Sequence, residues 1–140
     1  MSEAVKLHFL VDGEDFTSAG QASVQVKKSL RQLGISPEII RKVSIAMYEG
    51  EINMVIHAGG GEADVTIYED RIELRLCDHG PGIANIDLAM QEGFSTAPDN
   101  IRSLGFGAGM GLPNMKRYSD SMTIDSELGK GTTILMTVML

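Results

Sequence analysis

A carboxylate followed by two glycines is the first feature with chemical potential: Asp78-His79-Gly80-Pro81-Gly82-Ile83. The residues before it, 72–77, alternate apolar and polar side chains, which is typical of a half-buried strand. Asp78 is therefore expected where a strand ends, and glycine lets main chain approach a ligand closely. One interpretation is an adenine pocket, in which Asp78 accepts from the exocyclic amine. The other is a strand followed by a Pro-Gly turn, with Asp78 bonding its own backbone.

Glu49 and Asn53 lie four residues apart in a strongly apolar segment. On a helix they would share one face, whereas Glu51 would point to nearly the opposite side, toward solvent. A buried acid and amide need partners, so the pair is either bonded to neighbouring main chain or part of a site. In a site, Asn53 would hold magnesium, because one amide oxygen suffices when a nucleotide supplies the rest. Glu49 would then orient or deprotonate a hydroxyl or water.

Glycines alternate at four positions in Gly105-Phe106-Gly107-Ala108-Gly109-Met110-Gly111-Leu112, just before a predicted helix. The run differs from both the Walker A pattern and G-x-G-x-x-G. Bare amides and the positive end of the following helix would attract phosphate, and a flexible hinge is the alternative. Arg102, in the preceding loop, is either a charge for outer phosphates or a solvated loop residue.

The elements that must position these residues are both helices and strands. Ser18 and Gln21 could form a capping box before a helix that Gly34 closes. Ser36-Pro37 opens a second helix, which runs to about residue 57 and is apolar on more than one side, hence buried. Strands are expected at 6–11, 63–68, 71–78, 121–127 and 132–140, a short helical turn at 86–92, a long loop at 93–107 and a helix at 112–118.

The second and third of these strands are joined by a short acidic turn and form a predicted hairpin. Gly59-Gly60-Gly61 ends the buried helix. Since helices and strands are mixed and adjacent strands are joined by tight turns, we expect an α/β sandwich with a mostly antiparallel sheet.

Composition limits the classes of function. The chain has 140 residues, which suits a single domain spanning 1–140. Its net charge of −7 argues against nucleic acid as a partner. No apolar run approaches the roughly 20 residues of a membrane span, and the first residues lack the regions of a signal peptide. One cysteine, Cys77, fits a reducing cytosol, so a cytoplasmic location is expected.

Four motifs in order resemble the ATP-binding fold shared by gyrase, Hsp90, histidine kinases and MutL (the GHKL or Bergerat fold). They are Glu49 to Asn53, Asp78 to Ile83, Gly105 to Gly111, and Gly129-Lys130-Gly131-Thr132, so the resemblance covers about residues 36–140. It implies a two-layer sandwich with a mostly antiparallel mixed sheet and helices on one face.

The resemblance also implies roles for individual residues. Asn53 would hold Mg²⁺, Glu49 would be the catalytic base, and Asp78 and Thr132 would recognise the adenine of ATP. The other expected nucleotide-binding residues are Gly80, Gly82, Ile83, Arg102, Gly105, Gly107, Ala108, Gly109, Met110, Gly111 and Leu112.

Within this superfamily the chain looks like the anti-sigma-factor serine kinases of bacterial partner switching, and Gly93-Phe94-Ser95-Thr96 looks like the related stress-complex switch kinase. That resemblance implies phosphorylation of a serine or threonine on a STAS-type antagonist, and binding of a sigma factor. A homodimer is left open. The alternatives are a nucleotide-gated binding module without kinase activity and a detached histidine-kinase catalytic domain.

Overall fold

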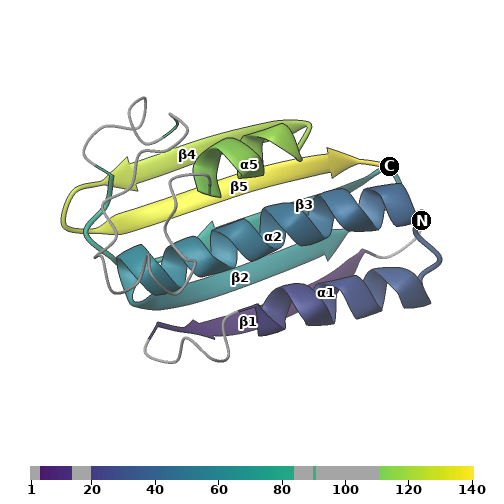
Figure 1. The fold of residues 1–140 in the computed structure, drawn as a ribbon, viewed down its shortest axis with the longest axis horizontal. Coiled ribbons are helices and arrows are strands. Elements are labelled where there is room, and N and C mark those ends of the chain that lie inside the picture. Colours follow the sequence, from purple (N-terminus) through teal and green to yellow (C-terminus); the bar gives the residue numbers. More distant parts are fainter. Residues whose placement is uncertain (1–3, 14–19, 84–89, 91–110) are drawn as a thin grey trace.

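The computed structural model describes residues 4–13, 20–83, 90 and 111–140. These residues form eight helices and strands, and Figure 1 shows how they are arranged. In chain order they are β1 (Val5–Asp12), α1 (Gln21–Gln32), α2 (Pro37–Ala58), β2 (Gly60–Ile67), β3 (Arg71–Cys77), α5 (Gly111–Arg117), β4 (Ser121–Glu127) and β5 (Gly131–Met139). The expected helical turn at 86–92 and loop at 93–107 fall outside the described residues, except Met90.

The five strands form one sheet in the order β1-β2-β3-β5-β4. Every neighbouring pair is antiparallel, so the described strands contain no parallel pair and the sheet is antiparallel rather than mixed. The hairpin of β2 and β3 is confirmed, with Ile67 opposite Ile72. The last strand in the sequence, β5, lies inside the sheet between β3 and β4.

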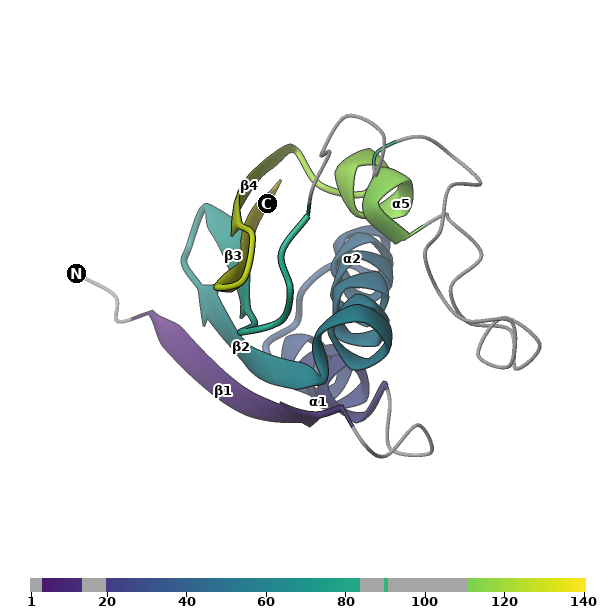
Figure 2. The ribbon, with the colours of Figure 1, turned by 90° about the vertical axis from the view of Figure 1, so that its left-hand side faces the viewer.

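The three helices in the described residues, α1, α2 and α5, cover the same face of the sheet, which gives the two expected layers (Figure 2). The core between the layers contains alternate strand residues and the inner faces of α1, α2 and α5. Its largest fully buried side chains include Leu30, Met47, Leu74, Met115 and Met136. Burying a side chain of this size stabilises the fold by about 1.5–3 kcal/mol. None of the helices in the described part of the chain is long and apolar enough to cross a membrane.

The long helix α2 begins and ends at the residues that the sequence predicts. The Ser36 hydroxyl accepts from the backbone N–H of Ile39 at 3.4 Å, and Pro37 follows it. Gly59 ends the helix in the left-handed conformation, with φ 71°. The next glycine residues begin β2, where a Cβ at Gly61 would lie 2.4 Å from the Cys77 carbonyl oxygen. The glycine run therefore both caps a helix and lets β2 pass close to the end of β3.

The start of α1 differs from the prediction. Its N-cap is Gly20, in the left-handed region with φ 98°, so the predicted capping box of Ser18 and Gln21 is wrong. The Glu51 carboxylate on α2 instead accepts from the amides of Gly20, Ala22 and Ser23 at 2.8, 3.2 and 3.1 Å. Glu51 is only 3% exposed, so its expected place in solvent is also wrong. Three unpaired N–H groups at a helix start are a suitable partner for a buried carboxylate.

Candidate functional site

Asp78 follows the last residue of β3, as the sequence predicts, and Thr132 lies beside it on β5. The Asp78 amide donates to the Thr132 carbonyl oxygen at 2.9 Å, and the Thr132 amide donates to Asp78 Oδ1 at 3.1 Å. Oδ1 also accepts from the Gly80 amide at 3.0 Å, which is the turn expected from the second interpretation. Asp78 is 8% exposed and Thr132 is 5% exposed. The carboxylate is therefore held in place by two chain segments.

The two glycines after Asp78 are required by contacts within the protein. A Cβ at Gly80 would lie 2.6 Å from Cβ of Ala58, at the end of α2. Gly82 has φ 82°, and a Cβ there would lie 2.5 Å from the carbonyl oxygen of Glu127. The turn that follows Asp78 is thus held between α2 and the β4–β5 connection.

Ser126 is a residue of this region that the sequence analysis missed. Its hydroxyl accepts from the Ile83 amide at 2.7 Å and lies 2.8 Å from the Thr132 hydroxyl oxygen. Ser126 stands opposite Thr132 in the β4–β5 pairing. From the sequence, only the expected pairing of these two strands could have pointed to Ser126. The serine joins the turn at Ile83 to the strand that holds Asp78.

Glu49 lies half-buried on α2 and faces the first turn of α5. A Cβ built at Gly111 would lie 3.6 Å from Glu49 Oε2. Burial raises the pKa of the Glu49 carboxyl, and the hydrogen bond from Asn114 lowers it in part. Asn114 is the second residue that the sequence analysis missed, because it lies 65 residues after Glu49 (114 − 49).

Asn53 is half-buried on the same helix, one turn after Glu49. Residues at this spacing share one helix face, so the pair that the sequence singled out can act on one ligand. Glu51 lies on the opposite face of α2, where its carboxylate contacts the start of α1. The two acids of this helix turn therefore have different surroundings, although they are two residues apart.

The predicted phosphate-binding residues fall mostly outside the described residues. Arg102, Gly105, Gly107, Ala108, Gly109 and Met110 are among those that the structure does not describe. Gly111 begins α5, one residue before the predicted start of the helix at Leu112. Leu112 is 6% exposed and belongs to the core, so its side chain packs inside the protein.

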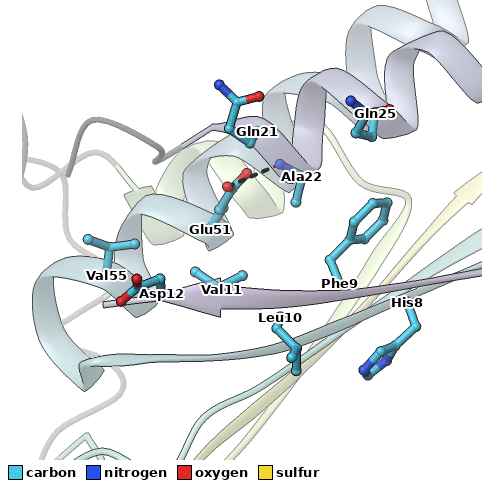
Figure 3. A pocket seen from close by; sticks show the side chains of 10 residues that line it. All are labelled: His8, Phe9, Leu10, Val11, Asp12, Gln21, Ala22, Gln25, Glu51 and Val55. Atoms are coloured by element: carbon cyan, nitrogen blue, oxygen red, sulfur yellow. Dashed lines mark hydrogen bonds between the residues drawn. The ribbon is translucent and has the colours of Figure 1, made fainter. Parts of the chain in front are cut away.

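A separate hollow of about 420 Å³ lies between β1 and α1 (Figure 3). Phe9, Val11, Ala22 and Val55 line it together with the buried Glu51. Figure 3 shows the Glu51 carboxylate turned toward the start of α1. None of the site residues predicted from the sequence is among the described residues that line this hollow.

Comparison with known proteins agrees with the motif order. Residues 38–140 match the family model described as histidine kinase-, DNA gyrase B-, and HSP90-like ATPase. An anti-sigma F factor of Clostridium acetobutylicum is 33% identical over 141 residues, which cover 97% of this chain and 93% of the relative. An anti-sigma F factor of Geobacillus thermodenitrificans is 31% identical over 121 residues, which cover 82% of this chain and 80% of the relative.

Two solved structures share the fold. The RsbU and RsbW domains of a Mycobacterium tuberculosis protein superpose with a TM-score of 0.60 and 16% identity, covering 96% of this chain and 32% of that chain. The SiaB–SiaC complex of Pseudomonas aeruginosa gives a TM-score of 0.57 and 11% identity, covering 96% of this chain and 89% of that chain. The family match and the full-length relatives show that this chain belongs to the histidine kinase-, DNA gyrase B- and HSP90-like ATPases, as a relative of the anti-sigma F factors.

Proposed function

We propose that this protein is an ATP-dependent serine/threonine kinase of a bacterial partner-switching pathway. Its substrate would be a small antagonist protein of the STAS type, and its second partner a sigma factor or a regulator of one. The observation that carries the proposal is the position of Glu49, a half-buried carboxylate beside Gly111, where the glycine run meets α5. The anti-sigma F factor relatives support the choice of partners.

The end of β3 suits an adenine base. Asp78 uses Oδ1 for both of its backbone donors, so the carboxylate has a fixed orientation and Oδ2 can accept from an exocyclic amine. The Thr132 and Ser126 hydroxyls lie 2.8 Å apart beside it and offer further polar contacts. A buried polar group is costly without a partner, and here the partners hold the acceptor still.

Asn53 suits Mg²⁺ as a single protein ligand. Magnesium prefers oxygen ligands and usually keeps water and nucleotide phosphates around it, so one amide oxygen is a sufficient protein contribution. When bound, the ion would neutralise charge on the phosphates. Asn53 stands one helical turn from Glu49, so the ion site and the proposed base would lie on the same helix face.

Glu49 would act as the base in the transfer. Its carboxylate takes the proton from a serine or threonine hydroxyl, whose oxygen forms a new bond to the γ-phosphorus of ATP. The bond from that phosphorus to the β–γ bridging oxygen breaks, and ADP leaves with the electron pair. Burial raises the pKa of Glu49, which makes it a stronger base than an exposed glutamate. Positioning supplies much of the remaining catalysis.

The Glu49→Gln variant tests this role. With labelled ATP and a purified STAS protein, transfer to the partner should fall by about 10²–10⁴-fold, while nucleotide affinity is retained. Glu38→Gln, in the first turn of the same helix, is the matched control and should transfer at the wild-type rate. A Glu49→Gln protein that phosphorylates its partner at full rate would exclude Glu49 as the base.

A second candidate is a nucleotide-gated binding module without kinase activity. The name of the curated relatives, anti-sigma F factor, describes opposition to a sigma factor and mentions no transfer. Label that appears on a partner serine or threonine favours the kinase. Nucleotide-dependent partner binding without label favours the binding module, and acid-labile label favours a histidine kinase.

A further inference from the structure

The helices and the strands of this chain carry opposite charge. The helices α1, α2 and α5 contain seven lysines and arginines against three glutamates, and two of those glutamates, Glu49 and Glu51, are half-buried and buried. The five described strands contain three lysines and arginines against six acids. Although the chain has a net charge of −7, its helix layer therefore presents a basic surface.

Most of these cations gather at one end of the helix layer, which we call the basic end. Only residues 33–36 separate the end of α1 from the start of α2. Helix α5 runs back along α2, because its first residue, Gly111, lies beside Glu49, and Tyr118, just after its last residue, lies under Arg41. The end of α1, the start of α2 and the end of α5 therefore lie toward the same end of the layer (Figure 1). The basic end consists of Lys28, Arg31, Arg41, Lys42, Lys116 and Arg117.

The cations of the sheet layer have carboxylate partners, whereas most cations of the basic end lack one within the described residues. Arg71 contacts Asp70 and Glu73 at 2.9 and 3.2 Å, and Lys130 contacts Glu127 at 3.2 Å. Four cations of the basic end form no ion pair with any residue that the structure describes: Lys28, Arg31, Lys42 and Lys116. Internal ion pairs therefore do not account for this surface.

Helix stability accounts for part of the charge. A helix dipole favours cations in the last turn, where Arg31 of α1 and Lys116 and Arg117 of α5 lie. It does not favour cations near the start of a helix, yet Arg41 and Lys42 lie in the second turn of α2. The dipole therefore leaves the charges of Arg41 and Lys42 without an explanation.

The neighbours of these cations suit a protein partner. The Arg41 guanidinium lies over the Tyr118 ring, 5.7 Å from its centroid, and this stacking restricts the arginine. Leu33, between α1 and α2, is 48% exposed. Arginine and tyrosine beside apolar side chains are typical of protein interfaces. A long polyanion such as nucleic acid would also meet the acids of the sheet layer, so an acidic face of a folded protein fits best.

The basic end is within reach of a protein that is bound at Glu49. Arg41 precedes Glu49 by eight residues on α2, which is about 12 Å along the helix axis. Both residues lie against the α5 segment, Glu49 at Gly111 and Arg41 at Tyr118. An interface of standard size covers about 800 Å² on each partner, which extends over more than this distance. One partner can therefore cover Glu49 and the basic end together.

We propose that the basic end docks an acidic face of the protein substrate, a STAS-type antagonist, while the substrate hydroxyl reaches Glu49. This inference rests on the proposed function, which supplies the transfer and the class of substrate. Charges away from the reacting atoms increase affinity and the rate of encounter, and they leave the chemical step unchanged. The substrate then presents Asp or Glu side chains about 12 Å from its phosphorylated residue.

The first test measures binding and needs no transfer. The STAS proteins encoded in the same genome are purified, and each is titrated by calorimetry into the Glu49→Gln variant with Mg-ATP. Arg41→Glu and Lys116→Glu, each added to that variant, should weaken binding of the partner about 10-fold, because a like charge then faces its acids. Lys6→Glu makes the same charge change on the exposed start of β1 and should leave the affinity within about 2-fold.

The second test measures transfer with labelled ATP. In the otherwise wild-type protein, each reversal should raise KM for the STAS protein about 10-fold and leave kcat within about 2-fold, since docking is lost equally from the ground and transition states. Affinity for Mg-ATP should not change, which a displaced α5 would not allow. Arg41→Lys keeps the charge and should keep KM close to wild type. Lys116→Glu decides the result if Arg41→Glu unfolds early.

The outcomes separate this proposal from the proposed kinase. Unchanged partner affinity in both Arg41→Glu and Lys116→Glu, or no binding by any of these STAS proteins, overturns the docking surface. Partner affinity that falls in both reversals, with no label transferred by the wild type, supports the docking and overturns the kinase. If both reversals instead abolish binding to phosphatidylserine vesicles or to duplex DNA and leave STAS affinity intact, the basic end serves another polyanion and the proposal is wrong.

Discussion

A single oxygen atom, Oδ1 of Asp78, holds its own turn and a strand residue that lies 54 positions further along the chain. The turn at Gly80 and the strand at Thr132 both donate to it. A carboxylate oxygen that accepts two backbone N–H groups has little freedom to rotate. Asp78 is therefore a rigid acceptor, and the second interpretation of the sequence, a self-bonded turn, is compatible with the first.

We expect Asp78→Asn to separate these two roles. The amide keeps an oxygen that can accept the two backbone hydrogen bonds, but its NH₂ would face the amine of an adenine as donor to donor. ATP affinity should fall at least 10-fold, about 1.4 kcal/mol, with a small change in melting temperature. Titration calorimetry measures the affinity, and Asp125→Asn, on the exposed side of β4, is the control. Unaltered ATP affinity in Asp78→Asn would rule out adenine recognition by this residue.

The raised pKa of Glu49 predicts a pH-dependent stability. The folded protein holds this proton more tightly than the unfolded chain, so the contribution of Glu49 is fully present below its ordinary value of 4.5. It is lost as the pH rises through the folded pKa, because burying the charged form is unfavourable. Glu49→Gln should therefore be more stable than wild type at pH 7, and this advantage should shrink at pH 4.

Urea unfolding of both proteins at the two pH values measures that difference. Glu38→Gln provides the comparison, as an exposed glutamate of the same helix. If Glu49→Gln gains more stability at pH 4 than at pH 7, the burial of the Glu49 charge does not oppose folding. The expected result means that the proposed base is kept at a cost in stability.

Between elements, the contact of Glu51 with α1 is the main departure from the sequence prediction. Glu51→Ala would leave three amides at the start of α1 without their acceptor, and it would leave a gap in the buried layer. Leaving one buried N–H donor without its acceptor costs up to about 1–3 kcal/mol. We therefore expect Glu51→Ala to lower the free energy of unfolding by about 2–4 kcal/mol in total.

Chemical denaturation measures the loss at Glu51, and hydrogen exchange of the Ala22 and Ser23 amides locates it. Glu38→Ala, in the exposed first turn of α2, should change stability by less than about 0.5 kcal/mol. Unchanged protection of the α1 amides in Glu51→Ala would show that α1 is held in place by its apolar face alone.

Local signals predicted the elements, and distant partners decided what the sequence could not predict. Strand alternation before Asp78, the Ser36-Pro37 start and the Gly59 end are properties of neighbouring residues, and all three are confirmed. Glu51, Ser126 and Asn114 owe their roles to residues that are not their neighbours in the sequence. Ser126 lies 6 positions from Thr132, and Asn114 lies 65 positions from Glu49. Helical spacing placed Glu51 opposite Glu49 correctly, but it carries no information about α1, which covers that face.

At the scale of the whole molecule, the candidate site takes its residues from both layers of the fold. Asp78 and Thr132 come from adjacent strands of the sheet, while Glu49 and Asn53 come from the helix above it. A ligand that bridges them would join the two layers, and binding to the folded state alone raises stability by mass action. The predicted ligand is therefore also a predicted stabiliser of the fold.

Mg-ATP at about 100 times its dissociation constant should stabilise the protein by about 2.7 kcal/mol and raise the melting temperature by roughly 5 °C or more. Removing magnesium with EDTA should remove part of that shift, and Asn53→Ala should make the remaining shift insensitive to magnesium. A melting temperature that does not respond to Mg-ATP would contradict both the proposed transfer and the binding module.

The interior place of β5 has a consequence for how the protein is made. In the complete sheet, residues 131–139 form β5 between β3 and β4. A nascent chain that has emerged only as far as residue 130 therefore has β3 as an unpaired sheet edge, and β4 has no strand to pair with. Asp78 then lacks the backbone donor from Thr132. The proposed adenine end of the site is thus among the last parts of this domain to form on the ribosome, and an exposed strand edge precedes it.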